Sequence, residues 1–221
     1  MRLVAGLATA CTVAALGAVP AAATTKPKPA PPVCKLIFDD EGDQTTPGDA
    51  SVDIVGGDFA SNGKQITAII RLKQLVNPNP QSPLGQAYFV SFTVKGSSDT
   101  LTLGAGLYPT GNQFTYGYQA EDPTSGVSTS YTLGNATGAI NGNEIRITAD
   151  IAKYPQAKLL KNGNKVTTIT ADARRVYGQR VVPSQQVGPV RAPLGGLTLT
   201  YDEATGKTYT LGARSCVAVG K

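Results

Sequence analysis

Hydrophobic and polar residues alternate one by one along several short segments of the chain. The segments at 66–73, 88–95 and 145–151 carry apolar side chains at every second position, with mostly Ser, Thr and charged residues between them. Because successive side chains of a strand point to opposite faces, this pattern predicts strands with one buried and one solvated face. Turn sequences rich in Gly, Asn and Ser, such as 61–63 and 141–143, separate these segments.

Short strands at this spacing predict an all-β fold, a jelly-roll-type β-sandwich with mainly antiparallel strands. We expect strands at 35–38, 51–60, 65–75, 86–95, 100–108, 113–120, 128–133, 138–141, 144–151, 166–177, 197–202 and 207–217. At most one short helix is expected, at 156–161, where Asn162-Gly163 would end it. The Pro and Gly residues of 183–196 predict a long surface loop.

The amino terminus has the features of a secretory signal peptide. A short positive start, Met1-Arg2, precedes an apolar stretch at 3–19, and the small residues Ala21 to Ala23 follow. Signal peptidase requires small residues at such a position, so residues 1–23 are predicted to be removed and the chain secreted. A lipoprotein signal ending at Cys11 is the alternative, but apolar sequence continues well past Cys11.

The mature chain is predicted to be one domain behind a linker. Residues 24–33 are rich in Pro and form a stiff, polar spacer. Residues 34–221 suit a single all-β domain, and we expect a monomer. No second apolar run approaches the ~18 residues that cross a bilayer, so no membrane span is predicted.

Two cysteines remain after the signal peptide, Cys34 and Cys216, one near each end of the predicted domain. In an oxidising exterior compartment they are predicted to form a disulfide. Two buried free thiols are the alternative. A bridge over this separation would stabilise the fold by roughly 5 kcal/mol on the chain-entropy account.

The chain has no His and no Trp. Catalytic triads that use His and metal sites ligated by His are therefore excluded. A hydrolase that uses two carboxylates stays open as a rival, but no pattern selects a pair among Glu121, Asp122, Glu144 and Asp202. We therefore predict a protein without catalytic activity.

Acidic residues concentrate at the start of the predicted domain. Residues 34–60 contain seven acidic residues and one basic residue, whereas 61–221 contain sixteen basic and eight acidic residues. Carboxylates crowded in this way repel one another, and the repulsion must be relieved by solvent, by cations of the chain or by a metal ion.

Calcium is the metal that this acidic segment would suit. Calcium takes six to eight oxygen ligands, and a loop with closely spaced Asp and a Gly can wrap around it. We expect Asp39, Asp43 and Asp53 as ligands, with Asp40 and Asp49 as further candidates. The spacing does not match an EF-hand, and a solvated acidic turn that pairs with Lys and Arg is the alternative.

The order of these features resembles a group of secreted actinobacterial proteins. The resemblance rests on five segments: Cys34 to Phe38, Asp39-Asp40-Glu41-Gly42-Asp43, Val52-Asp53-Ile54-Val55, Asp58 to Lys64, and Ile66 to Leu75. These proteins are similar in turn to DOMON-like domains and to carbohydrate-binding module family 9, which are jelly-roll-type β-sandwiches. The resemblance implies this fold, with calcium at Asp39, Asp43 and Asp53. The chain departs from the pattern at Asp40, where Pro is usual, and lacks the Trp rings that hold sugar in that family.

An aromatic stripe is the candidate surface for a sugar. Phe114, Tyr116 and Tyr118 occupy every second position of one predicted strand and therefore share a face. Facing outward they would form a stacking platform, and facing inward they would belong to the core, which is the commoner arrangement.

A basic region lies in the second half of the chain and carries no interleaved aromatic residues, which disfavours nucleic acid as a partner. Its residues are Lys153, Lys158, Lys161, Lys165, Arg174, Arg175 and Arg180. The function predicted is a secreted, non-catalytic domain that binds an extracellular glycan or cell-wall polymer. A structural or protein-interaction module without a small ligand is the alternative.

Overall fold

The computed structural model describes residues 31–45, 48–178 and 197–220. The predicted signal peptide, most of the predicted linker and the predicted surface loop at 183–196 lie outside these residues. No helix among the described residues is long and apolar enough to cross a membrane.

The described chain consists almost entirely of antiparallel strands, which confirms the predicted all-β class. The elements in order are β1 (Ile37–Phe38), β2 (Ile54–Ser61), β3 (Gln65–Leu72), β4 (Gln86–Val94), β5 (Thr100–Tyr108), β6 (Gly111–Glu121), β7 (Ser128–Asn135), β8 (Thr137–Asn141), β9 (Glu144–Asp150), the 3-10 helix η1 (Ile151–Lys153), β10 (Lys165–Gly178), β11 (Leu197–Gly206) and β12 (Tyr209–Thr210).

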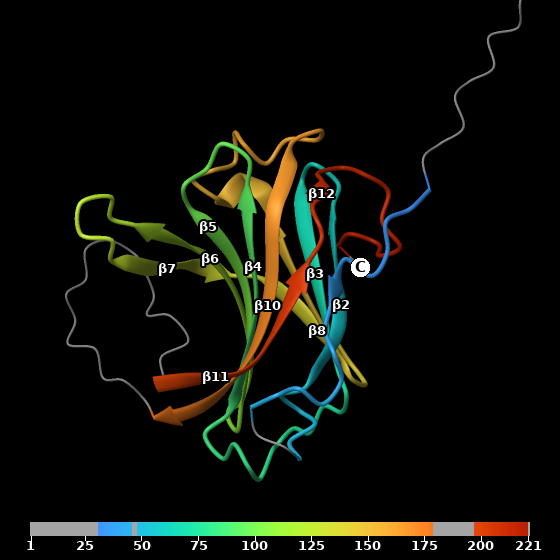
Figure 1. The fold of residues 1–221 in the computed structure, drawn as a ribbon, viewed down its shortest axis with the longest axis vertical. Coiled ribbons are helices and arrows are strands. Elements are labelled where there is room, and N and C mark those ends of the chain that lie inside the picture. The colour runs from blue at the N-terminus through green and yellow to red at the C-terminus, as the bar shows by residue number, and fades with distance from the viewer. Residues whose placement is uncertain (1–30, 46–47, 179–196, 221) are drawn as a thin grey trace, which may run out of the picture. The chain divides into compact units, whose positions relative to one another are not determined.

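The strands form one continuous sheet that curls on itself into a barrel-like sandwich (Figure 1). The order is β7-β6-β5-β4-β10-β11-β1-β2-β3-β9-β8, with β12 paired to β10. The two edge strands, β7 and β8, follow each other in the chain with only Ala136 between them. The chain therefore passes from one edge of the sheet directly to the other, where the two faces of the sandwich meet.

Strand β10 joins the two faces of the sandwich. It pairs with β4 along one side and with β11 along the other, so it connects the strands of one face to those of the other. The register with β11 shifts between Ala173 and Arg174, which marks a β-bulge. Bulges increase local twist and bending, and this one helps the sheet to turn toward β11 and β1.

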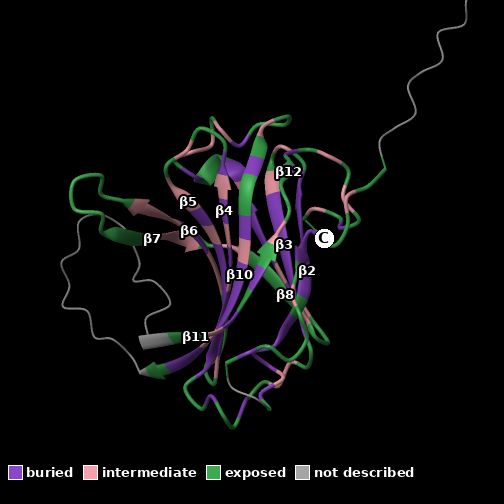
Figure 2. Cartoon of the chain, in the orientation of Figure 1, coloured by how far each residue is buried: buried purple, intermediate pink, exposed green. Residues whose placement is uncertain are grey.

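The predicted alternation of apolar and polar residues determines which side chains form the core. Along β4, Tyr88, Val90 and Phe92 are buried, and the residues between them are partly exposed. The buried residues of both faces meet inside the sandwich, whereas β7 is largely exposed (Figure 2). Phe59 of β2 packs against Phe92, with the ring centroids 4.9 Å apart, and so links the two faces.

Three predictions of local structure were wrong. The short helix is η1 at Ile151–Lys153, whereas 156–161 forms turns. The strand predicted at 207–217 is reduced to β12, because the chain turns after Thr210 and then crosses the outside of β2 and β3. Strand β2 begins at Ile54, not at 51, because the backbone N–H of Val52 donates to the carbonyl of Asp49 in a turn.

Cys34 and Cys216 form the predicted bridge, with their Cα atoms 5.2 Å apart. The chain flanking the two cysteines is also paired, since the backbone N–H of Val33 donates to the carbonyl of Arg214 at 2.8 Å. The carboxyl-terminal segment packs Val217 against Ala60 and Ile69 on the outer face of β2 and β3. The two ends of the domain are therefore held together covalently and by packing.

Candidate metal centre

The acidic loop begins where β1 ends. Asp39 follows the last residue of β1, and the loop turns at Gly42, whose φ of +90° lies in a region that favours glycine. This turn reverses the chain, so Asp43 comes back toward Asp39. The loop therefore holds two carboxylates of one short segment close together.

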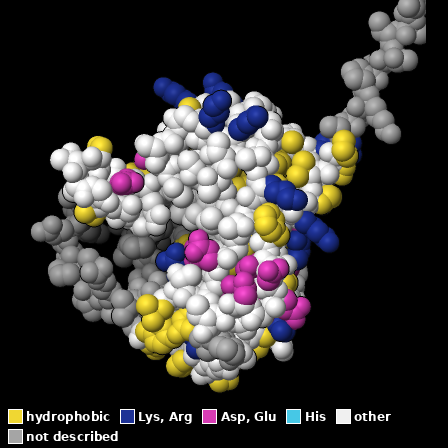
Figure 3. All heavy atoms as spheres, in the orientation of Figure 1, with side chains coloured by type: hydrophobic (Ala, Val, Ile, Leu, Met, Phe, Trp, Pro, Cys, Tyr) yellow, Lys and Arg dark blue, Asp and Glu magenta, His cyan; other side chains and the backbone are white. Residues whose placement is uncertain are grey.

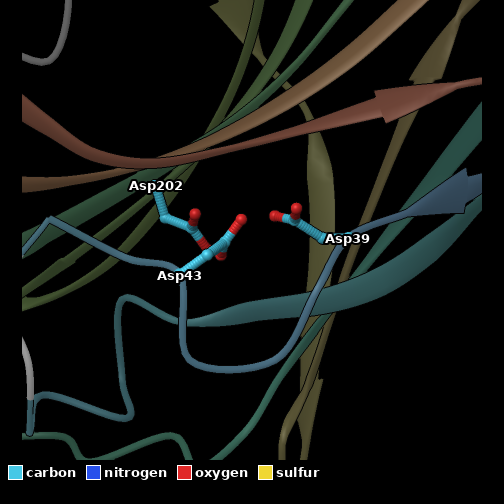
Figure 4. Close-up of side chains that lie close together, drawn as sticks. All are labelled: Asp39, Asp43 and Asp202. Carbon is cyan, nitrogen blue, oxygen red and sulfur yellow. The ribbon is translucent and has the colours of Figure 1, made fainter.

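A third carboxylate reaches this loop from the distant strand β11. Oxygens of Asp39, Asp43 and Asp202 all lie within 4.8 Å of one another. Figure 4 shows the three side chains pointing toward one another, two from the loop and one from β11. We call these three residues the acidic triad. The pairing of β1 with both β11 and β2 is what brings the loop beside Asp202.

Backbone amides hold Asp202 in place. One of its carboxylate oxygens accepts a hydrogen bond from the Ile54 N–H at 2.6 Å, and the other accepts from the Glu203 N–H at 3.0 Å. Its side chain is buried, with the residue only 6% exposed. Asp39 accepts from the Asp40 N–H through Oδ1, whereas its buried Oδ2 has no hydrogen-bond partner among the described residues.

Asp53 lies beneath the loop. It is fully buried, and its Oδ1 accepts a hydrogen bond from the Gly42 N–H at 3.1 Å, which fixes the turn. Its Oδ2 has no hydrogen-bond partner among the described residues. Among the described residues, Lys73 is the cation that pairs with it, with Nζ 3.8 Å from Asp53 Oδ2 and 3.0 Å from Glu41 Oε1. The negative charge on the buried Asp53 Oδ2 is thus only weakly balanced by a positive charge.

Burial and neighbouring carboxylates raise the pKa of two residues of the triad. Burial raises the pKa of Asp39 to about 7, and the nearby Asp202 and Asp43 carboxylates add to the effect. Burial likewise raises the pKa of Asp202 to about 6, with contributions from Asp43 and Asp53. Asp39 and Asp202 therefore resist ionisation unless a positive charge is present.

The geometry and the chemistry of the triad fit a calcium ion. Oxygens bound to one calcium ion at 2.3–2.6 Å lie at most about 5 Å apart, which the triad satisfies. The unpartnered Oδ2 of Asp39 supplies a lone pair that no donor among the described residues takes up. Asp53, also predicted as a ligand, is not one of the three residues whose oxygens converge. Backbone carbonyls or water would complete the six to eight ligands that calcium requires.

Asp49, a further predicted candidate, is engaged elsewhere. Its carboxylate accepts hydrogen bonds from Arg175, from the Ser51 N–H and hydroxyl, and from Asn79. Burial would raise its pKa, but the hydrogen bonds from Ser51 and Arg175 outweigh burial and lower it. The Arg175 guanidinium also lies 4.5 Å from the centroid of the Tyr201 ring. This network ties the loop before β2 to β10. Asp40, by contrast, is exposed and outside the triad.

The aromatic stripe on β6 faces mainly inward. Tyr116 is 8% exposed and packs edge-on against Tyr154, with the ring centroids 5.2 Å apart. Phe114 and Tyr118 are partly buried against the same core. At the open edge of the sheet, Tyr118 stacks on Tyr131 of β7 at 4.9 Å between centroids. A flat aromatic pair is therefore partly accessible there.

Sequence reasoning did not select Asp202 as a ligand. The local pattern pointed the other way, because Leu197, Leu199 and Tyr201 alternate with polar residues and Asp202 falls on the polar side. The structure instead buries Asp202 and leaves Leu199 exposed. An acidic residue on the inward side of a strand needs a partner, because a buried charge without one is costly. The identity of that partner depends on which segment lies opposite, and the local sequence does not contain this information.

Comparison with known proteins returns no match, whether with family models, with curated protein sequences or with solved structures.

Proposed function

We propose that this protein is a secreted, non-catalytic domain that binds an extracellular glycan or cell-wall polymer, with a calcium ion that stabilises its acidic loop. The observation that carries the proposal is the convergence of Asp39, Asp43 and Asp202 beside carboxylate oxygens that lack hydrogen-bond partners. The signal-peptide pattern of residues 1–23 supports secretion.

Calcium binding is tested by thermal unfolding and calorimetric titration of the mature chain in calcium, magnesium or chelator. A ligand that binds only the folded state stabilises it by about 2.7 kcal/mol at a hundredfold excess over Kd. We expect stabilisation of this order with calcium and little with magnesium, which requires a near-ideal octahedral site. Equal melting temperatures in calcium and chelator would contradict the proposal.

Two matched variants locate the ion. Asp43→Asn removes the exposed ligand of the triad and is expected to abolish the calcium response. Asp40→Asn removes the same charge from the same loop but lies outside the triad, so its calcium response is expected to match that of the unchanged protein. Equal loss in both variants would indicate only a general effect of loop charge.

Glycan binding is tested by retention of the mature chain on cell walls and on a panel of polysaccharides, with and without chelator. The stacked Tyr118 and Tyr131 at the sheet edge support this part of the proposal, because sugars stack on flat aromatic faces. A Tyr131→Ala variant is expected to lose retention without losing its calcium response. Absence of retention on every polymer would favour a structural or protein-interaction module.

A carboxylate-based hydrolase is the rival that one observation favours, namely the raised pKa of Asp39 and of Asp202 within one cluster. The two pockets described on the molecule lie elsewhere. The larger, of about 150 Å³, lies beside Gln65, Arg146 and Thr148, and no carboxylate lines either pocket. Glycan release by the native chain but not by Asp39→Asn would establish the hydrolase.

A further inference from the structure

Six exposed lysines gather at one end of the barrel, which we call the lysine end. They come from the β2–β3 turn, the β4–β5 turn, η1 and the segment that leads into β10. The residues are Lys64, Lys95, Lys153, Lys158, Lys161 and Lys165. Several of these segments are joined by backbone hydrogen bonds, from the Lys95 N–H to the Lys165 carbonyl and from the Ile151 N–H to the Lys64 carbonyl, each at 2.8 Å. Figure 3 shows Lys and Arg side chains clustered at the top of the molecule, apart from the acidic side chains lower on the same face.

Carboxylates compensate little of this charge. Asp150 pairs with Lys153 at 3.3 Å, and Asp99 accepts a hydrogen bond from Gln156 at 2.6 Å. Within the described part of the chain, none of the other five lysines forms an ion pair. The lysine end therefore carries a net positive charge that attracts anions from solution.

The backbone that presents these lysines is well anchored. The Asn164 side chain donates to the Leu159 carbonyl at 2.7 Å, and the Asn164 N–H donates to the Lys161 carbonyl at 3.1 Å. The Leu211 N–H donates to the Asn164 carbonyl, which ties the segment to the chain beyond β12. The positive charges thus project from a fixed framework, which lowers the ordering cost of binding.

The side chains of the lysine end favour some kinds of polyanion over others. Tyr154, the aromatic residue of η1 and its flanking turns, is 3% exposed and donates its hydroxyl hydrogen to the Thr102 carbonyl, so its own ring is closed to a nucleobase. The partly accessible pair of Tyr118 and Tyr131 lies on β6 and β7, strands that carry none of the six lysines. Lysines are compact point charges that suit phosphate groups spaced along a chain. The six lysines come from four separate segments that meet at one end of the barrel, so the surface suits an extended polymer more than a small anion.

We infer that the lysine end is a docking surface for a phosphodiester-linked polyol polymer outside the cell. This inference rests on the proposed function for the location of the protein, and it assigns a polymer class and a surface separate from the acidic triad. Binding is electrostatic, weakens as salt concentration rises, and does not require calcium.

The test measures the affinity of the mature chain for poly(glycerol phosphate) in chelator over a series of salt concentrations. One triple variant, Lys158→Gln with Lys161→Gln and Lys165→Gln, removes three charges from the lysine end. The matched triple, Lys35→Gln with Lys207→Gln and Arg214→Gln, removes three exposed charges that are not among the six lysines. We expect the first triple to weaken binding at least about tenfold at low salt and to reduce the slope of log affinity against log salt by about 2. The matched triple is expected to change affinity less than about twofold.

Several outcomes would overturn the inference. Equal losses in the two triples would show that only net charge matters, and tighter binding of single-stranded DNA than of the polymer at equal charge would indicate a nucleic-acid surface. Retention on neutral glycans without affinity for the polymer would refute this inference and leave the proposed function standing. Polymer binding through the lysines without retention on any polysaccharide would support the inference and refute the glycan-binding part of the proposed function.

Discussion

At the residue scale, the acidic triad explains both the fit to calcium and an expected weakness of the calcium-free protein. Asp202 is held by two backbone amides, and Asp39 has one oxygen without a hydrogen-bond partner among the described residues. Burial and neighbouring carboxylates raise the pKa of Asp39 to about 7 and that of Asp202 to about 6, against an ordinary value of 3.8. The folded protein therefore binds more protons than the unfolded chain between about pH 4 and pH 7.

This difference predicts a pH dependence of stability. Because the folded state holds the extra protons, the free energy of unfolding without calcium should fall as pH rises from about 4 to 7. Asp39→Asn should flatten this dependence and raise the melting temperature at pH 7.5 by a few degrees, about 2–4 °C or ~1 kcal/mol, a small value because Asp39 is partly exposed. Unfolding curves in chelator across this pH range provide the measurement.

The control for this prediction is Asp40→Asn, which changes the same net charge at an exposed position outside the triad. It should change the pH dependence only slightly, because the Asp40 carboxylate makes the smallest of the contributions that raise the pKa of Asp39. Saturating calcium should also remove the fall of the free energy of unfolding with rising pH, because bound calcium displaces protons from the ligands. A stability that rises between pH 4 and pH 7 in chelator would refute the account of the triad.

At the scale of elements, the passage from β7 to β8 closes the sandwich. The Ala136 N–H, between these strands, donates to the Phe114 carbonyl of β6 at 2.9 Å. The Phe114 ring lies so close to Gly138 of β8 that a Cβ there would come within 2.0 Å of a ring carbon. Gly138 thus makes room for an inward-facing ring, which is why the first residue of the aromatic stripe contacts the opposite edge of the sheet.

This contact predicts a coupled pair of substitutions. Gly138→Ala should destabilise the fold by about 1–3 kcal/mol, because the ring must move from its packed position. In a Phe114→Leu background the same substitution should cost clearly less, since the smaller side chain leaves room for the methyl group. Urea unfolding of the unchanged protein, the two single variants and the double variant measures the coupling between the two positions. If Gly138→Ala lowers the free energy of unfolding equally in both backgrounds, the Phe114 ring does not lie over β8.

At the scale of the whole molecule, one covalent link closes nearly the entire domain. The Cys34–Cys216 bridge spans a sequence separation of 182 residues and joins the segment before β1 to the segment after β12. Strand β1 pairs with both β2 and β11 although it has only two residues. The bridge therefore anchors the short strand from which the acidic loop emerges.

Removal of the bridge should destabilise the protein by about 5 kcal/mol, because the unfolded chain regains the freedom of a long loop. The measurement compares guanidinium unfolding of the native chain with that of a Cys34→Ser, Cys216→Ser variant. The variant should also bind calcium more weakly, since the acidic loop loses its anchor. Equal unfolding midpoints would show that packing of Val217 against Ala60 and Ile69 already holds the ends together.

The sequence by itself determined most of the strands and the bridge. Period-two alternation is local, because each side chain's face depends only on its position along its own strand, and it located β3, β4 and β9 well. The cysteine pair was predicted from the number of cysteines that follow the signal-peptide pattern. The acidic loop was also visible, since Asp39 and Asp43 lie four residues apart.

Only the tertiary structure decided which carboxylates meet. Asp202 lies more than 150 residues from Asp43 along the chain and joins it because β11 pairs with β1. Asp49 lies nearer to Asp43 in sequence but is drawn into the network of Arg175 on β10. Whether a buried acid finds a cation of the chain or another acid depends on strand order and register. These are long-range properties of the sheet, which hydrophobic periodicity along a single strand does not encode.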